Sequence, residues 1–190
     1  MIISSFSFLS KLNLAFITLF YPNLNKNVFK STMLSFCNGV EMLTRDFVAT
    51  VYIVNDAKVL LVFHKKLNAW LPPGGHIDEN ELPCDAAKRE ALEETGFEVK
   101  LIGEDAPLGK GVKKLAHPKV VQLEDIKDGH QHIDLVYYGI IANGKLKLNS
   151  KEHSDINWFS ASELDSNEVI ESVRVYGKKA IEELGNSKIQ

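Results

Sequence analysis

The sequence predicts an α/β (α+β) fold in which helices pack on a mixed β-sheet. Runs rich in β-branched and aromatic residues recur along the chain, as expected for strands. Two stretches with helical signals are placed among and after these runs. Strands interspersed with helices are typical of a sheet that is covered by helices.

The first predicted element is a β-hairpin. Residues 47–54 read FVATVYIV, and a second apolar run at residues 59–63 follows the turn residues Asn55 and Asp56. Residues 70–75 then contain two prolines and two glycines, and they are predicted to form a loop.

A helix is predicted from about Pro83 to Thr95. Proline suits the first turn of a helix, and Asp85 complements the helix dipole there. Gly96 is well placed to end the helix, whereas Leu82 is a poor N-cap.

Further strands are predicted at residues 97–102, 132–142 and 156–159, with one or two more inside residues 103–130. The dipeptide Asn143-Gly144 is a strong hairpin signal, which predicts a returning strand at residues 145–148. A second helical pattern covers residues 168–184 and closes the domain.

Length and composition limit the classes of function. At 190 residues, with 45% hydrophobic and 25% charged residues, the chain fits one globular domain. Its net charge of -3 lacks the basic footprint of a nucleic-acid-binding surface, so no nucleic-acid partner is expected. Cys37 and Cys84 form no CxxC pair, which argues against a disulfide framework or zinc site and favours a reducing cytoplasm.

Residues 1–41 differ in composition from the rest of the chain. The apolar stretch from Leu14 to Tyr21 is shorter than the roughly 20 residues that span a membrane, and no membrane partner is expected. We interpret residues 1–41 as an N-terminal extension, either poorly ordered or an artefact of the gene model. A cleaved or anchoring segment is the alternative. The working domain is placed at residues 42–190.

Three glutamates carry the first chemical signal. Glu90, Glu93 and Glu94 are spaced so that a helix places them on one side, within reach of one another. These like charges repel, and the nearby C-terminal end of the helix dipole disfavours them further. A solvated acidic surface is the plainer interpretation. A Mg²⁺ ion, which prefers carboxylate and phosphate oxygens, accounts for all three carboxylates together.

The glutamates belong to a longer pattern, G-x5-E-x7-R-E-U-x-E-E-x-G-U, in which U is an apolar residue. The residues that match its fixed positions are Gly75, Glu81, Arg89, Glu90, Glu93, Glu94, Gly96 and Phe97. This pattern resembles the Nudix box, and a looser resemblance extends over about residues 43–164. Asn80, Leu82 and Ala91 depart from the residues usual at their positions, but none of these departures removes a metal ligand.

The resemblance implies a Nudix α/β/α sandwich and a hydrolase that cleaves a phosphoanhydride bond in a nucleoside diphosphate derivative. The residues implied as ligands of Mg²⁺, with Mn²⁺ as an alternative ion, are Gly75, Glu90, Glu93 and Glu94. Glu93 and Glu94 are also implied as catalytic. Arg89 would pair with Glu81 and tie the loop to the helix. Hydrolysis of this kind needs no covalent intermediate.

The general base of this family comes either from the box or from a later loop. Glu152 precedes Trp158 at a distance similar to that of the later-loop base, and it is our candidate. A solvated loop carboxylate is the alternative.

A second polar pattern lies at the start of the strand predicted near residue 132. His130, His132 and Asp134 alternate, so their side chains share one face and could lie beside the substrate. We interpret them as the polar face of an edge strand, because a zinc site would need further ligands.

The substrate is inferred by elimination. The tyrosine and the proline that mark dinucleoside-polyphosphate and ADP-ribose members are absent near Lys113. We expect a nucleoside triphosphate, intact or damaged, cleaved to a monophosphate and pyrophosphate by a monomer or homodimer. The alternatives are an ADP-ribose or RNA 5′-end pyrophosphohydrolase, and a Nudix-fold domain that senses a nucleotide without cutting it.

Overall fold

The computed structural model describes residues 43–103 and 110–185. The chain divides into the units Met1–Leu43 and Thr44–Gln190, and every element described here belongs to the second. The prediction for residues 1–41 lies outside the described residues. The elements are β1 (Thr44–Asn55), β2 (Lys58–His64), β3 (Ala69–Leu71), β4 (Gly74–His76), α3 (Pro83–Thr95), β5 (Phe97–Leu101), β6 (Val120–Lys127), β7 (His130–Gly144), β8 (His153–Ser160), the 3₁₀ turn η1 (Glu163–Asp165) and α4 (Glu171–Leu184).

The strands form one mixed sheet. The main path runs β3-β2-β1-β7-β5, while β4 pairs with β1, β6 with β7 and β8 with β2. The β1–β7 pair is parallel, and the other pairs are antiparallel. The predicted mixed sheet is therefore confirmed.

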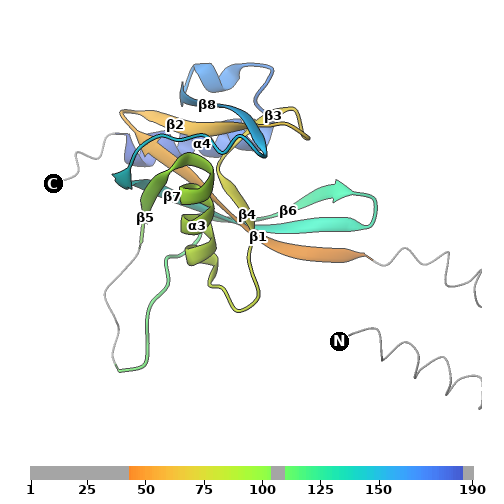
Figure 1. Cartoon of the computed structure of the whole chain (residues 1–190), viewed down its shortest axis with the longest axis vertical. Coiled ribbons are helices and arrows are strands. Elements are labelled where there is room, and N and C mark those ends of the chain that lie inside the picture. The colour runs from red at the N-terminus through yellow and green to blue at the C-terminus, as the bar shows by residue number, and fades with distance from the viewer. Residues whose placement is uncertain (1–42, 104–109, 186–190) are drawn as a thin grey trace, which may run out of the picture. The chain divides into compact units, whose positions relative to one another are not determined.

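The two faces of the sheet carry separate apolar cores. Along β1, the side chains of Ala49, Val51 and Ile53 join the core that α3 covers. The intervening Tyr52 and Val54 join the core that α4 covers. This alternation follows from the period of two in a strand. Figure 1 shows α3 in front of the sheet and α4 behind it, which confirms the predicted α/β/α sandwich.

The N-terminal hairpin forms as predicted, whereas the following loop contains two short strands. Asp56 and Ala57, between β1 and β2, both have positive φ, as a tight turn of the mirror-image type requires. In the predicted loop at residues 70–75, Gly74 pairs with Thr50 of β1. A Cβ at Gly74 would lie 2.7 Å from the carbonyl oxygen of Ala49, so only glycine permits this pairing.

The predicted strand at residues 145–148 is wrong. Gly144 ends β7 against Phe97, and the chain then turns toward the end of α3. The amides of Lys147 and Asn149 donate to the carbonyls of Thr95 and Glu94, at 2.8 and 3.1 Å. The last carbonyls of a helix have no partner within it, and they capture this segment in place of a hairpin.

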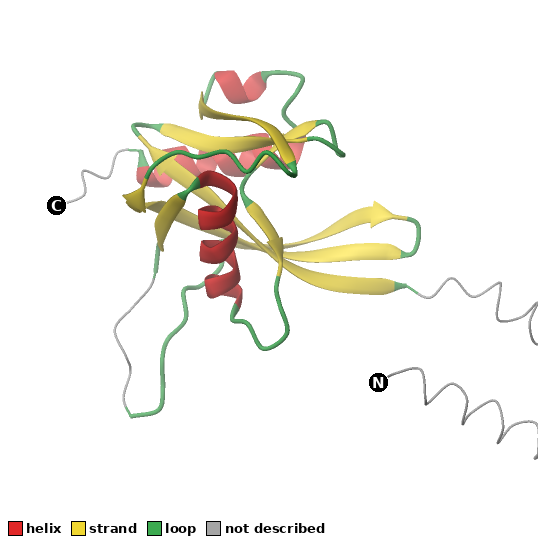
Figure 2. Ribbon diagram, viewed as in Figure 1, coloured by secondary structure: helices red, strands yellow, loops and turns green. Residues whose placement is uncertain are grey.

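The prediction of one or two strands inside residues 103–130 is confirmed by β6, which pairs with β7 as the long hairpin seen in Figure 2. Two further predictions are corrected near β7 and α4. Since β7 is also paired with β1, it is not an edge strand. The closing helix begins at Glu171 and not at residue 168, because Glu168 accepts bonds from the backbone and indole of Trp70. Neither described helix is long and apolar enough to cross a membrane.

Candidate active site

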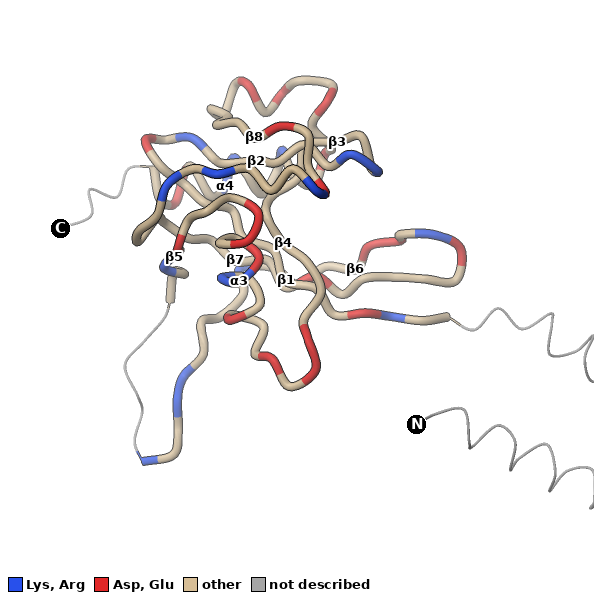
Figure 3. The backbone as a smooth tube through the Cα atoms, viewed as in Figure 1, with Lys and Arg blue, Asp and Glu red and all other residues tan. Residues whose placement is uncertain are grey.

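Helix α3 presents the glutamates that the sequence singled out. It begins at Pro83, and the N-cap residue Leu82 makes no side-chain hydrogen bond to the helix. Gly96 ends the helix with a φ of 76°. Small residues of α3 pack on the sheet, so the polar side of the helix is left for charged groups. Figure 3 shows Asp and Glu concentrated along α3 and the loop before it.

Arg89 ties this loop to the helix. Its Nε and Nη2 donate to the two carboxylate oxygens of Glu81, both at 2.9 Å, in a bidentate pair. Nη2 also donates to the backbone carbonyl of His76 at 3.0 Å. The hydrogen bond from Arg89 holds the pKa of Glu81 below its ordinary value, while the same bond raises the pKa of Arg89. The contact predicted between Arg89 and Glu81 is present.

Gly75 lies against the carboxylate of Glu90. A Cβ at Gly75 would stand 2.5 Å from Oε1 of Glu90, so the absence of a side chain lets the loop and the helix meet. Nη1 of Arg89 donates to the same Oε1 at 2.6 Å. Burial raises the pKa of Glu90 despite that bond, and the charges of Glu94 and Glu93 raise it further.

Glu94 is the buried carboxylate of the helix. Its side chain lies beside the ring of His153, with Oε1 and Nε2 2.8 Å apart, and both residues are buried. Its other oxygen accepts the backbone N–H of Gly74 at 3.3 Å. Glu152 is exposed, and its carboxylate lies within 4.8 Å of the ligand atoms of Glu94 and His153. The segment that begins at Lys147 and Asn149 is held at the end of α3, and it thus brings Glu152 and His153 close to Glu94.

The structure separates the three predicted helical ligands. Within the described part of the chain, only Glu94 of these three belongs to a compact group of potential metal ligands. Glu90 is turned toward Arg89, and Glu93 is exposed, with Oε2 3.8 Å from Nη1 of Arg89. The three carboxylates share one side of α3 without converging on a single point.

A cleft of about 300 Å³ opens beside these groups. Gly74, Gly75 and Glu152 line it next to the helical carboxylates. Strands β1, β6 and β7 form another wall, to which His132 and Asp134 contribute. The first part of α4 completes the lining. A loop, the start of α4 and the sheet therefore enclose a space in which a small molecule would meet the carboxylates of Glu152, Glu124 and Asp134. Among the described residues, those of α3 do not line this space.

Asp134 is a buried acid within this cleft. It is 2% exposed, and Thr50 and Gln122 donate hydrogen bonds to its carboxylate. Burial, followed by the charge of Glu124, raises the pKa of Asp134 to about 7. Burial also raises the pKa of Glu124. The acid can therefore carry a proton near neutral pH.

Sequence reasoning missed the position of His153. Its neighbour Glu152 was singled out, but nothing in the residues around it signals that the histidine is buried beside Glu94. The position of Asp134 in the cleft was indicated only by its alternation with His130 and His132 in the sequence. Burial lowers the pKa of His64, which lines the cleft beside His153, and the charge of His153 lowers it further.

The arrangement can be compared with known proteins. A model of the NUDIX domain matches residues 44–179. The chain belongs to the NUDIX family. The match covers the whole described sheet and most of α4.

Related proteins agree with the membership in the NUDIX family. A Bacillus subtilis (strain 168) protein, named provisionally as an 8-oxo-dGTP diphosphatase, is 32% identical over 117 residues, which are 61% of this chain and 67% of that protein. A Lactococcus lactis protein, named provisionally as a DHNTP pyrophosphohydrolase, is 31% identical over 93 residues, 47% of this chain and 50% of its own length. A solved structure of a NUDIX hydrolase from Clostridium perfringens superimposes on this one with a TM-score of 0.65 and 36% sequence identity. The matched region covers 75% of this chain and 99% of the Clostridium perfringens chain.

Proposed function

We propose that this NUDIX hydrolase cleaves a nucleoside triphosphate, intact or damaged, to a nucleoside monophosphate and pyrophosphate in a reaction that depends on Mg²⁺. The observation that carries the proposal is the meeting of Glu94, Glu152 and His153 beside a cleft lined by Gly74 and Gly75. Carboxylates gathered at a cleft are suited to phosphate chemistry once a cation offsets their charge.

The donor set fits a hard cation. Among the described residues, each oxygen of Glu94 has one hydrogen-bond or ion-pair contact, with Gly74 or His153, whereas an ionised carboxylate offers about four lone-pair sites. The proposed ligands of the ion are Gly75, Glu90, Glu93 and Glu94. When bound, Mg²⁺ offsets the charge of the phosphates and polarises the phosphorus centre. His153 orients Glu94, and the Arg89–Glu81 pair holds the loop of Gly75 against α3.

Glu152 is the proposed general base. It is exposed at the cleft, near the buried Glu94, and it can take a proton from a water that attacks the phosphoanhydride. Glu93 and Glu94 are the proposed catalytic partners on the helix. No covalent intermediate is required.

The class of substrate is supported by two relatives. The Bacillus subtilis protein is named for 8-oxo-dGTP, an oxidised nucleoside triphosphate, and the Lactococcus lactis protein for DHNTP. The uncharged and acidic lining of the cleft would require a cation to accept a triphosphate. We also propose that the protein works in the cytoplasm, as a monomer or homodimer, without a nucleic-acid or membrane partner.

The test is a panel of substrates with product analysis. Purified protein is incubated with ordinary nucleoside triphosphates, 8-oxo-dGTP, ADP-ribose and a dinucleoside polyphosphate, with Mg²⁺ or with a chelator. The proposal expects pyrophosphate and a monophosphate from a triphosphate, only when Mg²⁺ is present. Release of single phosphate would contradict the proposed site of cleavage. Turnover of ADP-ribose alone would contradict the proposed substrate class.

The main rival is a domain that senses a nucleotide without cutting it. The complete set of box carboxylates argues against this rival. Saturable binding of a triphosphate in the same panel, without any turnover in Mg²⁺ or Mn²⁺, would favour it.

A further inference from the structure

Four potential metal ligands meet on three neighbouring strands, and none of them belongs to α3. Asp46 lies on β1, His130 and His132 on β7, and His76 on β4. The register pairs Asp46 directly with His132, and it pairs His76 with Val48, two residues along β1. Side chains two residues apart, and those of paired residues, share a face of a sheet. All four side chains therefore point to the same side.

The distances within this group suit a shared ion better than hydrogen bonds. Oδ2 of Asp46 lies 3.6 Å from Nε2 of His130 and 3.5 Å from Nε2 of His76. The ligand atoms of Asp46, His130 and His132 all lie within 4.8 Å of one another. Separations of 3.5–3.6 Å are long for a hydrogen bond. Two ligands of one tetrahedral zinc ion are roughly 3.4 Å apart, given bonds of about 2.1 Å.

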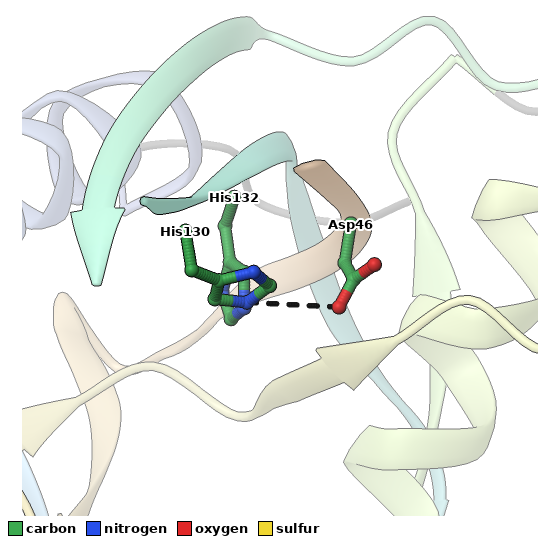
Figure 4. A group of neighbouring side chains, drawn as sticks. All are labelled: Asp46, His130 and His132. Atoms are coloured by element: carbon green, nitrogen blue, oxygen red, sulfur yellow. Dashed lines mark ion pairs between the residues drawn. The ribbon is translucent and has the colours of Figure 1, made fainter. Parts of the chain in front are cut away.

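The ring of His130 is oriented by a partner behind it. Its Nδ1 lies 2.8 Å from the hydroxyl of Thr44, and that hydroxyl donates to the carbonyl of Gly129 at 3.2 Å. If the hydroxyl proton is directed to Gly129, Nδ1 is the donor, and in the neutral ring the lone pair of Nε2 then faces the carboxylate of Asp46. Figure 4 shows this imidazole directed at Asp46, with the ring of His132 next to it. A lone pair facing a carboxylate is unfavourable until a proton or a metal ion lies between them.

We propose that Asp46, His76, His130 and His132 bind a divalent transition-metal ion of the zinc class at the edge of the cleft. Three imidazoles and one carboxylate match the ligand preference of Zn²⁺, whereas Mg²⁺ prefers oxygen. Asp46 and His76 supply the further zinc ligands that could not be assigned to His130 and His132 from the sequence. The rings of His76 and His132 also line the cleft, so the ion would hold the β1–β4–β7 wall together. This inference does not depend on the proposed hydrolysis.

The experiment measures zinc binding by metal-free full-length protein in excess Mg²⁺, which occupies oxygen-rich sites. Zinc affinity is read by competition with a chromogenic chelator, and thermal melting is recorded with and without Zn²⁺. The variants are His130→Ala and the gentler His132→Gln. His117→Ala, an exposed histidine outside the group, is the matched control. Glu94→Gln tests the other potential site, at His153.

The proposal expects one tightly bound zinc in the wild type, in His117→Ala and in Glu94→Gln. Each variant of the group should weaken binding by at least about a hundredfold, because even the loss of a residue that only orients a metal ligand costs about 10–100-fold. Each should also lose the zinc-dependent rise in melting temperature. Absence of tight binding in the wild type would overturn the proposal. So would unchanged binding in a folded His132→Gln variant, or loss of zinc in Glu94→Gln.

Discussion

Glu94 and His153 form a buried pair, with Oε1 and Nε2 2.8 Å apart, although they come from α3 and from the first residue of β8. The contact is short but not aligned as a linear hydrogen bond, and neither ring nitrogen has another hydrogen-bond partner in the described part of the chain. The histidine would therefore be able to adjust on the proposed binding of a cation by Glu94. Its position supports the carboxylate of Glu94 from one side.

Replacing His153 with alanine should lower turnover by about 10–100-fold and weaken the dependence on Mg²⁺, since orienting partners of metal ligands contribute on this scale. Steady-state kinetics over a range of Mg²⁺ concentrations measures both effects. His117→Ala, on an exposed loop, is the control. Unchanged kinetics in His153→Ala would show that Glu94 needs no support from this ring.

The two adjacent glycines should respond differently to alanine. At Gly75 the new methyl group meets the flexible end of Glu90, so Gly75→Ala should reduce turnover with a loss of stability below about 1 kcal/mol. At Gly74 it meets the backbone of Ala49 and Thr50, and Gly74→Ala should cost about 1–3 kcal/mol. Urea unfolding and turnover of both variants check this. Equal losses of turnover and of stability in the two variants would contradict this prediction.

Arg89→Lys should destabilise the loop before α3 by about 1–2 kcal/mol, because one ammonium cannot replace the bidentate fork to Glu81. Arg89 lowers the pKa of Glu81 in the folded protein, so this stability is present above the unfolded pKa of about 4.3 and is lost as pH falls through the lower folded value. Acid unfolding should therefore begin at a higher pH in Arg89→Lys. The exposed Arg45→Lys serves as control, and coincident acid transitions would refute the assignment.

Asp134 should make stability fall as the pH rises. Its folded pKa of about 7 lies above the unfolded value, so the folded state binds the proton more tightly, and the contribution is lost as pH rises through about 7. Asp134→Asn removes this loss. The variant should gain roughly 2–4 kcal/mol relative to the wild type between about pH 5 and about pH 8.5, at about 1.4 kcal/mol per pKa unit.

Urea unfolding at several pH values measures that gain. Asp128→Asn, at an exposed turn between β6 and β7, is the control and should follow the wild type at every pH. A constant difference between Asp134→Asn and the wild type would show that Asp134 keeps the same charge throughout.

Much of the fold could be predicted from local patterns. The hairpin of β1 and β2 and the bounds of α3 follow from turn residues, apolar runs and Gly96, which act within a few residues. The strand predicted at residues 145–148 fails because the deciding interaction is distant in sequence. The carbonyls of Glu94 and Thr95 compete for the amides of that segment, and no local signal reports them.

Part of the candidate site could be predicted because its residues match a known motif. The resemblance to the Nudix box implied the contact between Arg89 and Glu81, which the structure contains. The position of His153 beside Glu94, and of Asp46 beside His130, depends on which strands pair and in which register. A single sequence does not specify these pairings, and the histidines therefore read as ordinary polar residues.

The carboxylates of α3 are proposed to support hydrolysis that depends on Mg²⁺. The most direct measurement is the rate of pyrophosphate release from a saturating nucleoside triphosphate, with and without Mg²⁺, for wild type, Glu93→Gln and Glu98→Gln. Glu98 is an exposed glutamate on β5 and should not matter. We expect Glu93→Gln alone to lower the Mg²⁺-dependent rate by at least about a hundredfold, as when one electrostatic group is removed from an active site. A full rate in Glu93→Gln, or an equal loss in Glu98→Gln, would contradict it.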